Sequence, residues 1–158
     1  MLSQKSRYAL RALAVLAEHD EATPLSIQEI ATRADAPRKF LEAILLELRK
    51  DGVLISARGK LGGYTLAAPP DDIKLSRIIR TLDGPLAPIA CASLFFYQPC
   101  ADCPDPETCT TRGVMREVRD AVNDVLDGRT IADLAPDGAG ARKMIRKRSG
   151  KIPKRQSR

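Results

Sequence analysis

The first third of the chain alternates between apolar runs and polar breaks, as a set of short helices does. Residues 3–18 contain few helix breakers and an almost continuous apolar run, which predicts a helix buried from more than one side. Ser26 is followed three residues later by Glu29, which is the spacing of a capping box. This pair predicts a second, short helix that extends to about residue 33.

A third helix is predicted from Pro37 to Gly52, because proline suits the first turn of a helix and glycine commonly ends one. Its apolar positions recur on one face and are Phe40, Leu41, Ile44, Leu45 and Leu48. Two β-like runs follow at 53–57 and 64–67, and three of the six residues between them are glycine, which predicts a hairpin. Helices followed by such a hairpin predict a winged helix-turn-helix, whose third helix would enter the major groove of DNA.

The second half begins with an amphipathic helix at 74–83 and a long segment, 84–110, that contains five of the eleven prolines and all four cysteines. Because this cysteine segment has no apolar periodicity, we expect it to have little packing of its own. Helical periodicity returns at 111–128, with a charged face that includes Arg119. The opposite, apolar stripe consists of Val114, Val118, Ala121, Val122, Val125 and Leu126. We interpret this as a dimerisation helix, with packing onto its own domain as the alternative.

The sequence therefore predicts a mainly α protein, a winged helix-turn-helix with a long C-terminal dimerisation helix. The expected parts are a DNA-binding domain at 1–83, a sensor loop at 84–110, the dimerisation helix with an anchoring turn at 111–135, and a disordered basic tail at 136–158.

Charge is unevenly distributed along the chain. The whole protein has net charge +6, but residues 136–158 alone have nine Lys or Arg and one Asp, so residues 1–135 have net charge −2. The overall basicity is therefore no evidence that the predicted winged helix binds nucleic acid. With no run of about 18 apolar residues and no secretory leader, we expect a soluble, cytoplasmic protein without a membrane partner. One histidine and no recognisable nucleophile–base pair predict that it is not an enzyme.

Four stretches resemble the Rrf2 family of bacterial transcription regulators. They are KSRYALRAL at 5–13, IQEIA at 27–31, FLEAILLELRKDGVL at 40–54 and the wing SARGKLGGYTL at 56–66. The similarity covers about residues 1–135 and leaves the basic tail outside.

The resemblance implies a homodimer, usually a repressor, in which two winged helices bind a pseudo-palindromic operator in double-stranded DNA. Carried over by position, the residues facing DNA are Arg38, Lys39 and Glu42 on the recognition helix and Arg58, Lys60, Gly62 and Gly63 in the wing. Arg58 would enter the minor groove, with an exposed hairpin charge as the alternative. Glu42 is either a solvated charge or an acceptor from a cytosine amino group. The two glycines would shape the wing.

The four cysteines lie within nineteen residues, as Cys91, Cys100, Cys103 and Cys109. In a cytosolic protein such density favours metal binding or redox chemistry over structural disulfides. Cluster-binding members of the family have three cysteines with five residues between neighbours. Here only the interval from Cys103 to Cys109 matches, and a histidine that some members have after the last cysteine is Arg112.

We therefore expect an iron–sulfur cluster, 2Fe–2S or 4Fe–4S, bound by Cys91, Cys103 and Cys109, with Cys100 as the fourth ligand and His19 as a second candidate. Such a protein would respond to redox, iron or nitric-oxide signals. The alternatives are a zinc site of four thiolates, a cluster-free switch controlled by thiols or a protein partner, and no ligand at all. A zinc-stapled module that docks protein instead of DNA is the rival from another class.

Overall fold

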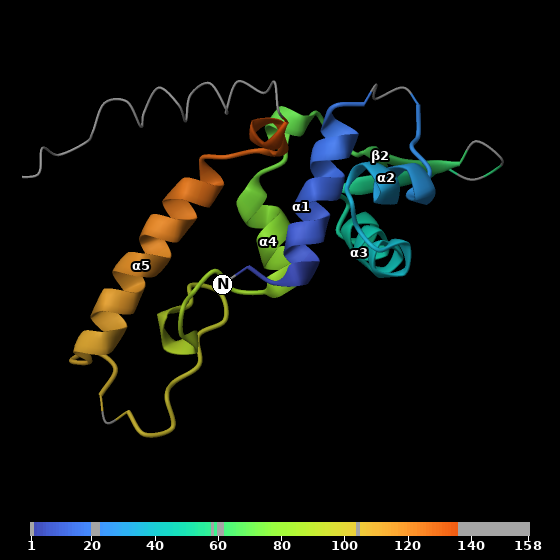
Figure 1. Ribbon diagram of the computed structural model, residues 1–158. Coiled ribbons are helices and arrows are strands. Elements are labelled where there is room, and N and C mark those ends of the chain that lie inside the picture. The colour runs from blue at the N-terminus through green and yellow to red at the C-terminus, as the bar shows by residue number, and fades with distance from the viewer. Residues whose placement is uncertain (1, 20–22, 58, 60–61, 104, 136–158) are drawn as a thin grey trace, which may run out of the picture.

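The computed structural model describes residues 2–19, 23–57, 59, 62–103 and 105–135 (Figure 1). The helices are α1 (Gln4–Ala17), α2 (Ile27–Arg33), α3 (Arg38–Lys50), α4 (Leu75–Asp83) and α5 (Thr110–Asp127). The strands are β1 (Leu54–Ala57) and β2 (Gly63–Leu66), and short 3₁₀ turns are η1 (Pro70–Asp72), η2 (Ala90–Ala92) and η3 (Ile131–Leu134). The predicted mainly α winged helix is therefore confirmed.

The centre of the winged helix is α1. It contacts α2, α3, α4 and β2, and its residues Ala9, Ala12 and Leu13 are fully buried. Contacts on several sides explain why its sequence is apolar nearly all round. The predicted capping box of α2 is present, because the Ser26 hydroxyl accepts from the Glu29 amide and the Glu29 carboxylate accepts from the Ser26 amide.

Helix α3 buries Leu41, Ile44, Leu45 and Leu48, as its periodicity predicts. The prediction that Phe40 shares this face is wrong, since its side chain is 46% exposed. Each residue advances about 100° around a helix, so Phe40 lies at the margin of the stripe defined by the other four. Its ring instead packs edge-on against Tyr8, with centroids 5.8 Å apart.

The wing is an antiparallel pair whose register runs from Leu54 opposite Leu66 to Ala57 opposite Gly63. Tyr64 also exchanges backbone hydrogen bonds with Leu25, which precedes α2, over 2.8 and 3.1 Å. The wing is thereby joined to the start of the helix-turn-helix. The predicted DNA contacts Arg58 and Lys60 lie outside the described residues.

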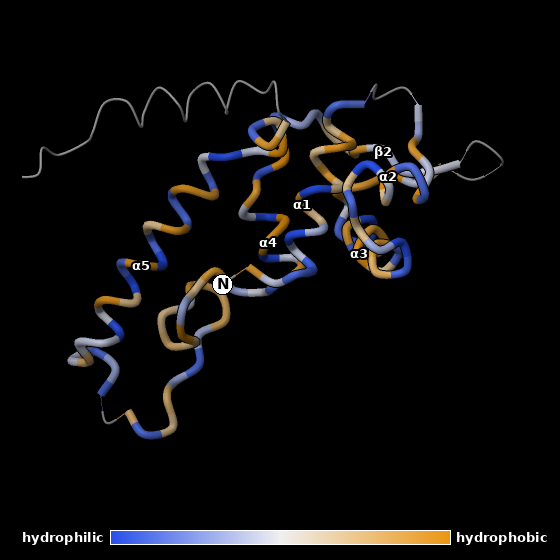
Figure 2. Tube along the Cα trace, viewed as in Figure 1, coloured by the Kyte–Doolittle hydropathy of each residue, from blue (hydrophilic) through white to orange (hydrophobic). Residues whose placement is uncertain are grey.

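Helix α5 contacts α4 and η2, while its N-terminal end extends away from the winged helix (Figure 1), and orange apolar positions recur along it (Figure 2). Val114, Val118, Val122 and Val125 are all at least 38% exposed, as an apolar stripe without an intramolecular partner would be. Arg119 belongs to the charged face opposite this stripe, but it is only 7% exposed. Its guanidinium turns toward η2 and donates to the Ala92 carbonyl over 2.6 Å.

The start of the cysteine segment is packed, contrary to expectation. Cys91 and Ala92 in η2 are 6% and 1% exposed, and η2 contacts α5. The polypeptide then returns to the core, where Ile131 of η3 is fully buried and donates its amide to the Ile73 carbonyl. The predicted disordered tail, 136–158, lies outside the described residues. In the part of the chain that the structure describes, none of the helices has the length and apolar character of a membrane span.

Candidate functional site

The turn between α2 and α3 is held by a residue of α1. Asp35 in this turn has a φ of 46°, a left-handed conformation that is uncommon for residues other than glycine. Arg11 donates from Nε to the Ala34 carbonyl over 2.7 Å and from Nη2 to the Asp35 carboxylate over 2.9 Å. Sequence analysis did not identify Arg11, because its partners are more than twenty positions away and nothing local indicates them. The angle between α2 and α3 thus depends on α1.

The first two turns of α3 expose Arg38, Lys39 and Glu42 together. Arg38 donates from Nε to a Glu42 carboxylate oxygen over 3.1 Å, and its Nη1 lies 3.5 Å from the Gln28 side-chain oxygen. An exposed pair of this kind contributes at most about 1 kcal/mol to stability, so its main consequence is orientation of the two side chains. Glu42 is thus an ion-pair partner of Arg38 in the free protein.

The wing glycines have distinct roles. Gly59 adopts a φ of 109°, which favours glycine, and the Gly62 amide donates to the Gly59 carbonyl over 3.0 Å. Gly63 lies against the Leu25 backbone, and a Cβ at this position would overlap the Leu25 carbonyl. The close approach of Gly63 to Leu25 is what a shaping role for this glycine would require.

All four cysteines have free thiols. Cys91 is buried, Cys103 and Cys109 are half-buried, and Cys100 is exposed. The structure brings the Sγ atoms of Cys91 and Cys100 to 3.7 Å. Cys109 is the N-cap of α5, where its Sγ accepts from the Arg112 amide over 3.4 Å. The first of the four cysteines is therefore packed in η2, and the last is the N-cap residue of α5.

Contacts among the thiols favour their neutral form. A hydrogen bond with the Cys91 thiol raises the pKa of Cys100, and the proximity of other thiols adds to this effect. Desolvation, followed by the nearby Cys109 thiol, raises the pKa of Cys103. Because a metal binds thiolate sulfur, ligation here would release protons, and the affinity for the metal would therefore increase with pH.

The donor set fits metal or cluster ligation in its chemistry and partly in its geometry. Two thiolates bound to one tetrahedral metal at about 2.3 Å would have sulfurs about 3.8 Å apart, and the 3.7 Å between Cys91 and Cys100 matches that separation. Over the described residues, no three His, Cys, Asp or Glu side chains converge on one point as a preformed metal site would require. The four thiols would have to draw together on binding.

His19 is separate from this group. Its Nε2 lies 3.2 Å from the Thr23 hydroxyl, beyond the C-terminal end of α1. The cysteine segment lies near the opposite, N-terminal end of α1 (Figure 1). Within one chain the structure therefore does not bring His19 to the cysteines.

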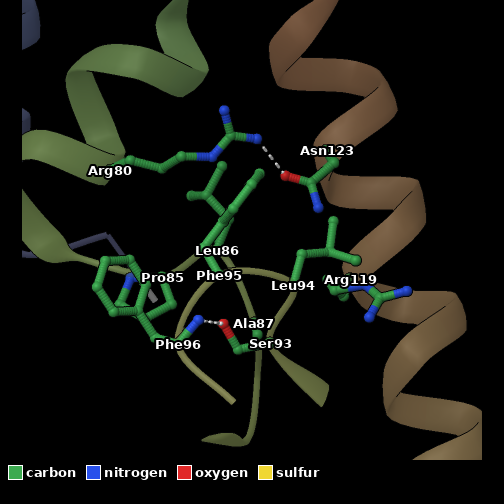
Figure 3. A pocket seen from close by; sticks show the side chains of 10 residues that line it. All are labelled: Arg80, Pro85, Leu86, Ala87, Ser93, Leu94, Phe95, Phe96, Arg119 and Asn123. Atoms are coloured by element: carbon green, nitrogen blue, oxygen red, sulfur yellow. Dashed lines mark hydrogen bonds between the residues drawn. The ribbon is translucent and has the colours of Figure 1, made fainter.

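Residues 93–96, directly after η2, lie between α4 and α5. Leu94, Phe95 and Phe96 line a small pocket with Arg80 of α4 and with Arg119 and Asn123 of α5 (Figure 3). Arg80 donates to the Asn123 side-chain oxygen over 2.7 Å and lies 5.9 Å from the Phe95 ring centre. The three apolar side chains remain more than half exposed. Movement of this segment would therefore change the contacts of both helices.

Comparison with known proteins gives consistent matches along the chain. The model of the Rrf2 family, described as an iron-dependent transcriptional regulator, matches residues 2–137. A protein of Rhodobacter capsulatus named as an rrf2-like HTH-type transcriptional regulator is 45% identical over 148 residues, which are 92% of this chain and 99% of the relative.

Two solved structures are also similar over most of their length. CymR, described as the global cysteine regulator of B. subtilis, matches with a TM-score of 0.70 and 35% identity, over 85% of this chain and 95% of CymR. IscR of T. potens matches with a TM-score of 0.69 and 33% identity, over 89% of this chain and 90% of IscR. The relatives have names of transcriptional regulators and not of enzymes, which agrees with the sequence prediction.

Proposed function

Because the chain belongs to the Rrf2 family, and is therefore a transcriptional regulator and not an enzyme, we propose that it represses transcription as a homodimer on a pseudo-palindromic operator. We further propose that an iron–sulfur cluster bound by its cysteines sets its affinity for that operator. The observation on which this rests is the grouping of four free thiols between the winged helix and α5.

DNA binding is supported by the division of α3 into two faces. The buried face packs on the core through Leu41, Ile44 and Leu45, so the polar face is free to enter the major groove. Arg38 and Lys39 would contact phosphates or base edges there, and Glu42 would orient Arg38 or accept from cytosine. Arg58 of the wing would supply the minor-groove contact.

Dimerisation is supported by α5. Two of its exposed valines line an open groove whose other walls include Ile79 of α4 and the strip of residues 85–88. Val118 and Val122 belong to both the stripe and this groove. Burying the stripes of two copies against each other would remove this apolar surface from water.

The cluster would be held by Cys91, Cys103 and Cys109, with Cys100 as the fourth ligand. When bound, it would supply iron that gains and loses electrons and sulfide that reacts with oxidants. The thiols would lose their protons, and the backbone from η2 to the cap of α5 would fold around the bound cluster. Since this backbone joins α4 to α5, ligation would bias the spacing of the two winged helices.

A cluster-free thiol switch is the second candidate. The 3.7 Å separation of the Cys91 and Cys100 sulfurs favours it, because a modest movement would bring them to bonding distance.

The test is the visible absorption and the iron and sulfide content of protein purified without oxygen. We expect a brown protein with both elements, and loss of colour on replacing Cys91, Cys103 or Cys109 with Ala. Thr111→Ala, an exposed change beside the cap of α5, serves as the matched control and should keep the colour. Colourless protein with neither iron nor sulfide, or with zinc alone, would contradict the cluster.

A further inference from the structure

We infer that Arg112 is the positioning residue of the cysteine segment. Its guanidinium fixes the backbone around Cys91, and it is the cation that a centre bound by the thiols would face. The positioning role rests on the contacts of the polypeptide alone, and the electrostatic role rests on the proposed function.

Arg112 contacts the cysteine segment near its beginning, middle and end. From Nε it donates to the Cys91 carbonyl over 3.1 Å, and from Nη1 it donates to the Pro106 carbonyl over 3.0 Å. The same Nη1 lies 3.1 Å from a Glu107 carboxylate oxygen, and the guanidinium lies 5.7 Å from the Tyr97 ring centre. One side chain in the first turn of α5 thus joins residues that are up to sixteen positions apart.

These contacts are stronger than those of an ordinary surface arginine. The Arg112 side chain is only 16% exposed, so water competes weakly for its donors. A guanidinium presents several N–H groups in a rigid plane and can serve two carbonyls at once, which the single ammonium of lysine cannot do in the same geometry. Hydrogen bonds from a charged donor are also about twice as strong as neutral ones.

Arg119 provides the adjoining contact. It lies seven residues further along α5, on the same face, and donates to the carbonyl of Ala92, next to Cys91. Two consecutive carbonyls of η2 are therefore held by two arginines of α5. The buried thiol of Cys91 is fixed in place relative to α5 through its own backbone.

Arg112 also matters for charge. Its backbone amide donates to the Cys109 sulfur, and its guanidinium donates to the Cys91 carbonyl, so it contacts two of the residues that would supply ligands. The ion pair with the exposed Glu107 carboxylate offsets part of the guanidinium charge. A guanidinium has no acceptor and cannot itself ligate a metal. A positive charge beside thiolate ligands stabilises the more negative, reduced form of a centre and therefore raises its reduction potential.

The experiment compares Arg112→Gln, Arg112→Lys and the control Arg116→Gln, which removes an exposed charge one turn along α5. The first measurement uses reduced protein without metal and follows alkylation of the Cys91 thiol by mass spectrometry. We expect about tenfold faster labelling in both Arg112 variants, because a lost charge-assisted hydrogen bond makes local opening about that much more frequent. The Arg116 control should label as the wild type does. Equal rates in Arg112→Gln and wild type would overturn the positioning role.

The second measurement is the midpoint potential of protein reconstituted with iron and sulfide. Arg112→Gln should shift it to lower potential, whereas Arg112→Lys should retain most of the wild-type value, since lysine restores charge but not the two-carbonyl contact. A merely structural role would move both variants alike, which would overturn the electrostatic part. If wild-type protein takes up no cluster, the proposed function and the electrostatic part fail together, and the labelling result still decides the positioning role.

Discussion

Gly63 at the start of β2 lies against the backbone of Leu25, which occupies the space that a Cβ on Gly63 would need. The next residue, Tyr64, pairs with Leu25 through two backbone hydrogen bonds. The wing and the approach to α2 are therefore in direct backbone contact, and the wing cannot shift without moving the helix-turn-helix.

Gly63→Ala should lower the free energy of unfolding by about 1–3 kcal/mol, because the methyl group forces two backbones apart. Chemical denaturation measures this directly. Gly113→Ala in α5 is the control, since a Cβ there meets no atom within 4 Å and alanine should raise helix stability by up to about 1 kcal/mol. Equal stability of the Gly63 variant and the wild type would contradict the contact.

The recognition surface predicts different effects for two basic residues on an operator selected from random duplex DNA. Lys39→Ala should reduce the salt dependence of binding by about one phosphate contact, whereas Arg58→Ala should weaken specific binding by roughly 1–3 kcal/mol. Lys74→Ala, an exposed change at the start of α4, is the control. If both variants bind the operator as the wild type does at every salt concentration, this surface does not read DNA.

The apolar stripe of α5 predicts that Val122→Asp weakens dimerisation while the winged helix stays folded, because Val122 is exposed within one chain. Sedimentation equilibrium measures the association, and circular dichroism checks the fold. Arg116→Gln changes the net charge equally on another face of α5 and should leave association unaltered. A Val122→Asp protein that dimerises as tightly as the wild type would exclude the stripe from the interface.

Acid should weaken the contact between α4 and the start of α1. Partial burial acts to raise the pKa of Asp83, but hydrogen bonds from the Ser3 backbone and hydroxyl outweigh it, so the pKa lies below its usual 3.8. The folded state therefore prefers the ionised carboxylate. This contribution is complete above the pKa of the unfolded chain and is lost as the pH falls through the lower, folded value.

Asp83→Asn should thus be less stable than the wild type at pH 7, with the difference shrinking below about pH 4 as the wild-type carboxylate becomes protonated. Thermal unfolding across this range measures it, with the exposed Asp71→Asn as control. A difference that stays constant with pH would contradict the role of the Ser3 hydrogen bonds.

The elements that the sequence predicted correctly are those specified locally. The capping box of Ser26 and Glu29 involves residues three apart, and the buried face of α3 follows from spacings of three and four. The apolar stripe of α5 was equally visible, because its residues also recur at spacings of three and four, and its four valines are exposed within one chain.

The features that the sequence did not reveal depend on distant parts of the chain. Arg119 reads as one more charge on a polar face until the carbonyl of Ala92, 27 residues earlier, is placed beside it. Arg11 likewise acts on a turn more than twenty residues away. Long polar side chains that satisfy backbone carbonyls leave no periodic signal, so the contacts of these two arginines could be found only in the structure. The same holds for the burial of Arg119 and Cys91.

Operator affinity before and after iron is removed from a single anaerobic preparation tests most directly whether the cysteine centre controls DNA binding. At fixed salt, we expect the Kd of the wild type to change by about tenfold or more, the range typical of coupling between two sites. The variant with Cys91, Cys103 and Cys109 all replaced by Ala should show no such change. A wild-type Kd that is the same with and without iron would contradict control of DNA binding by these cysteines.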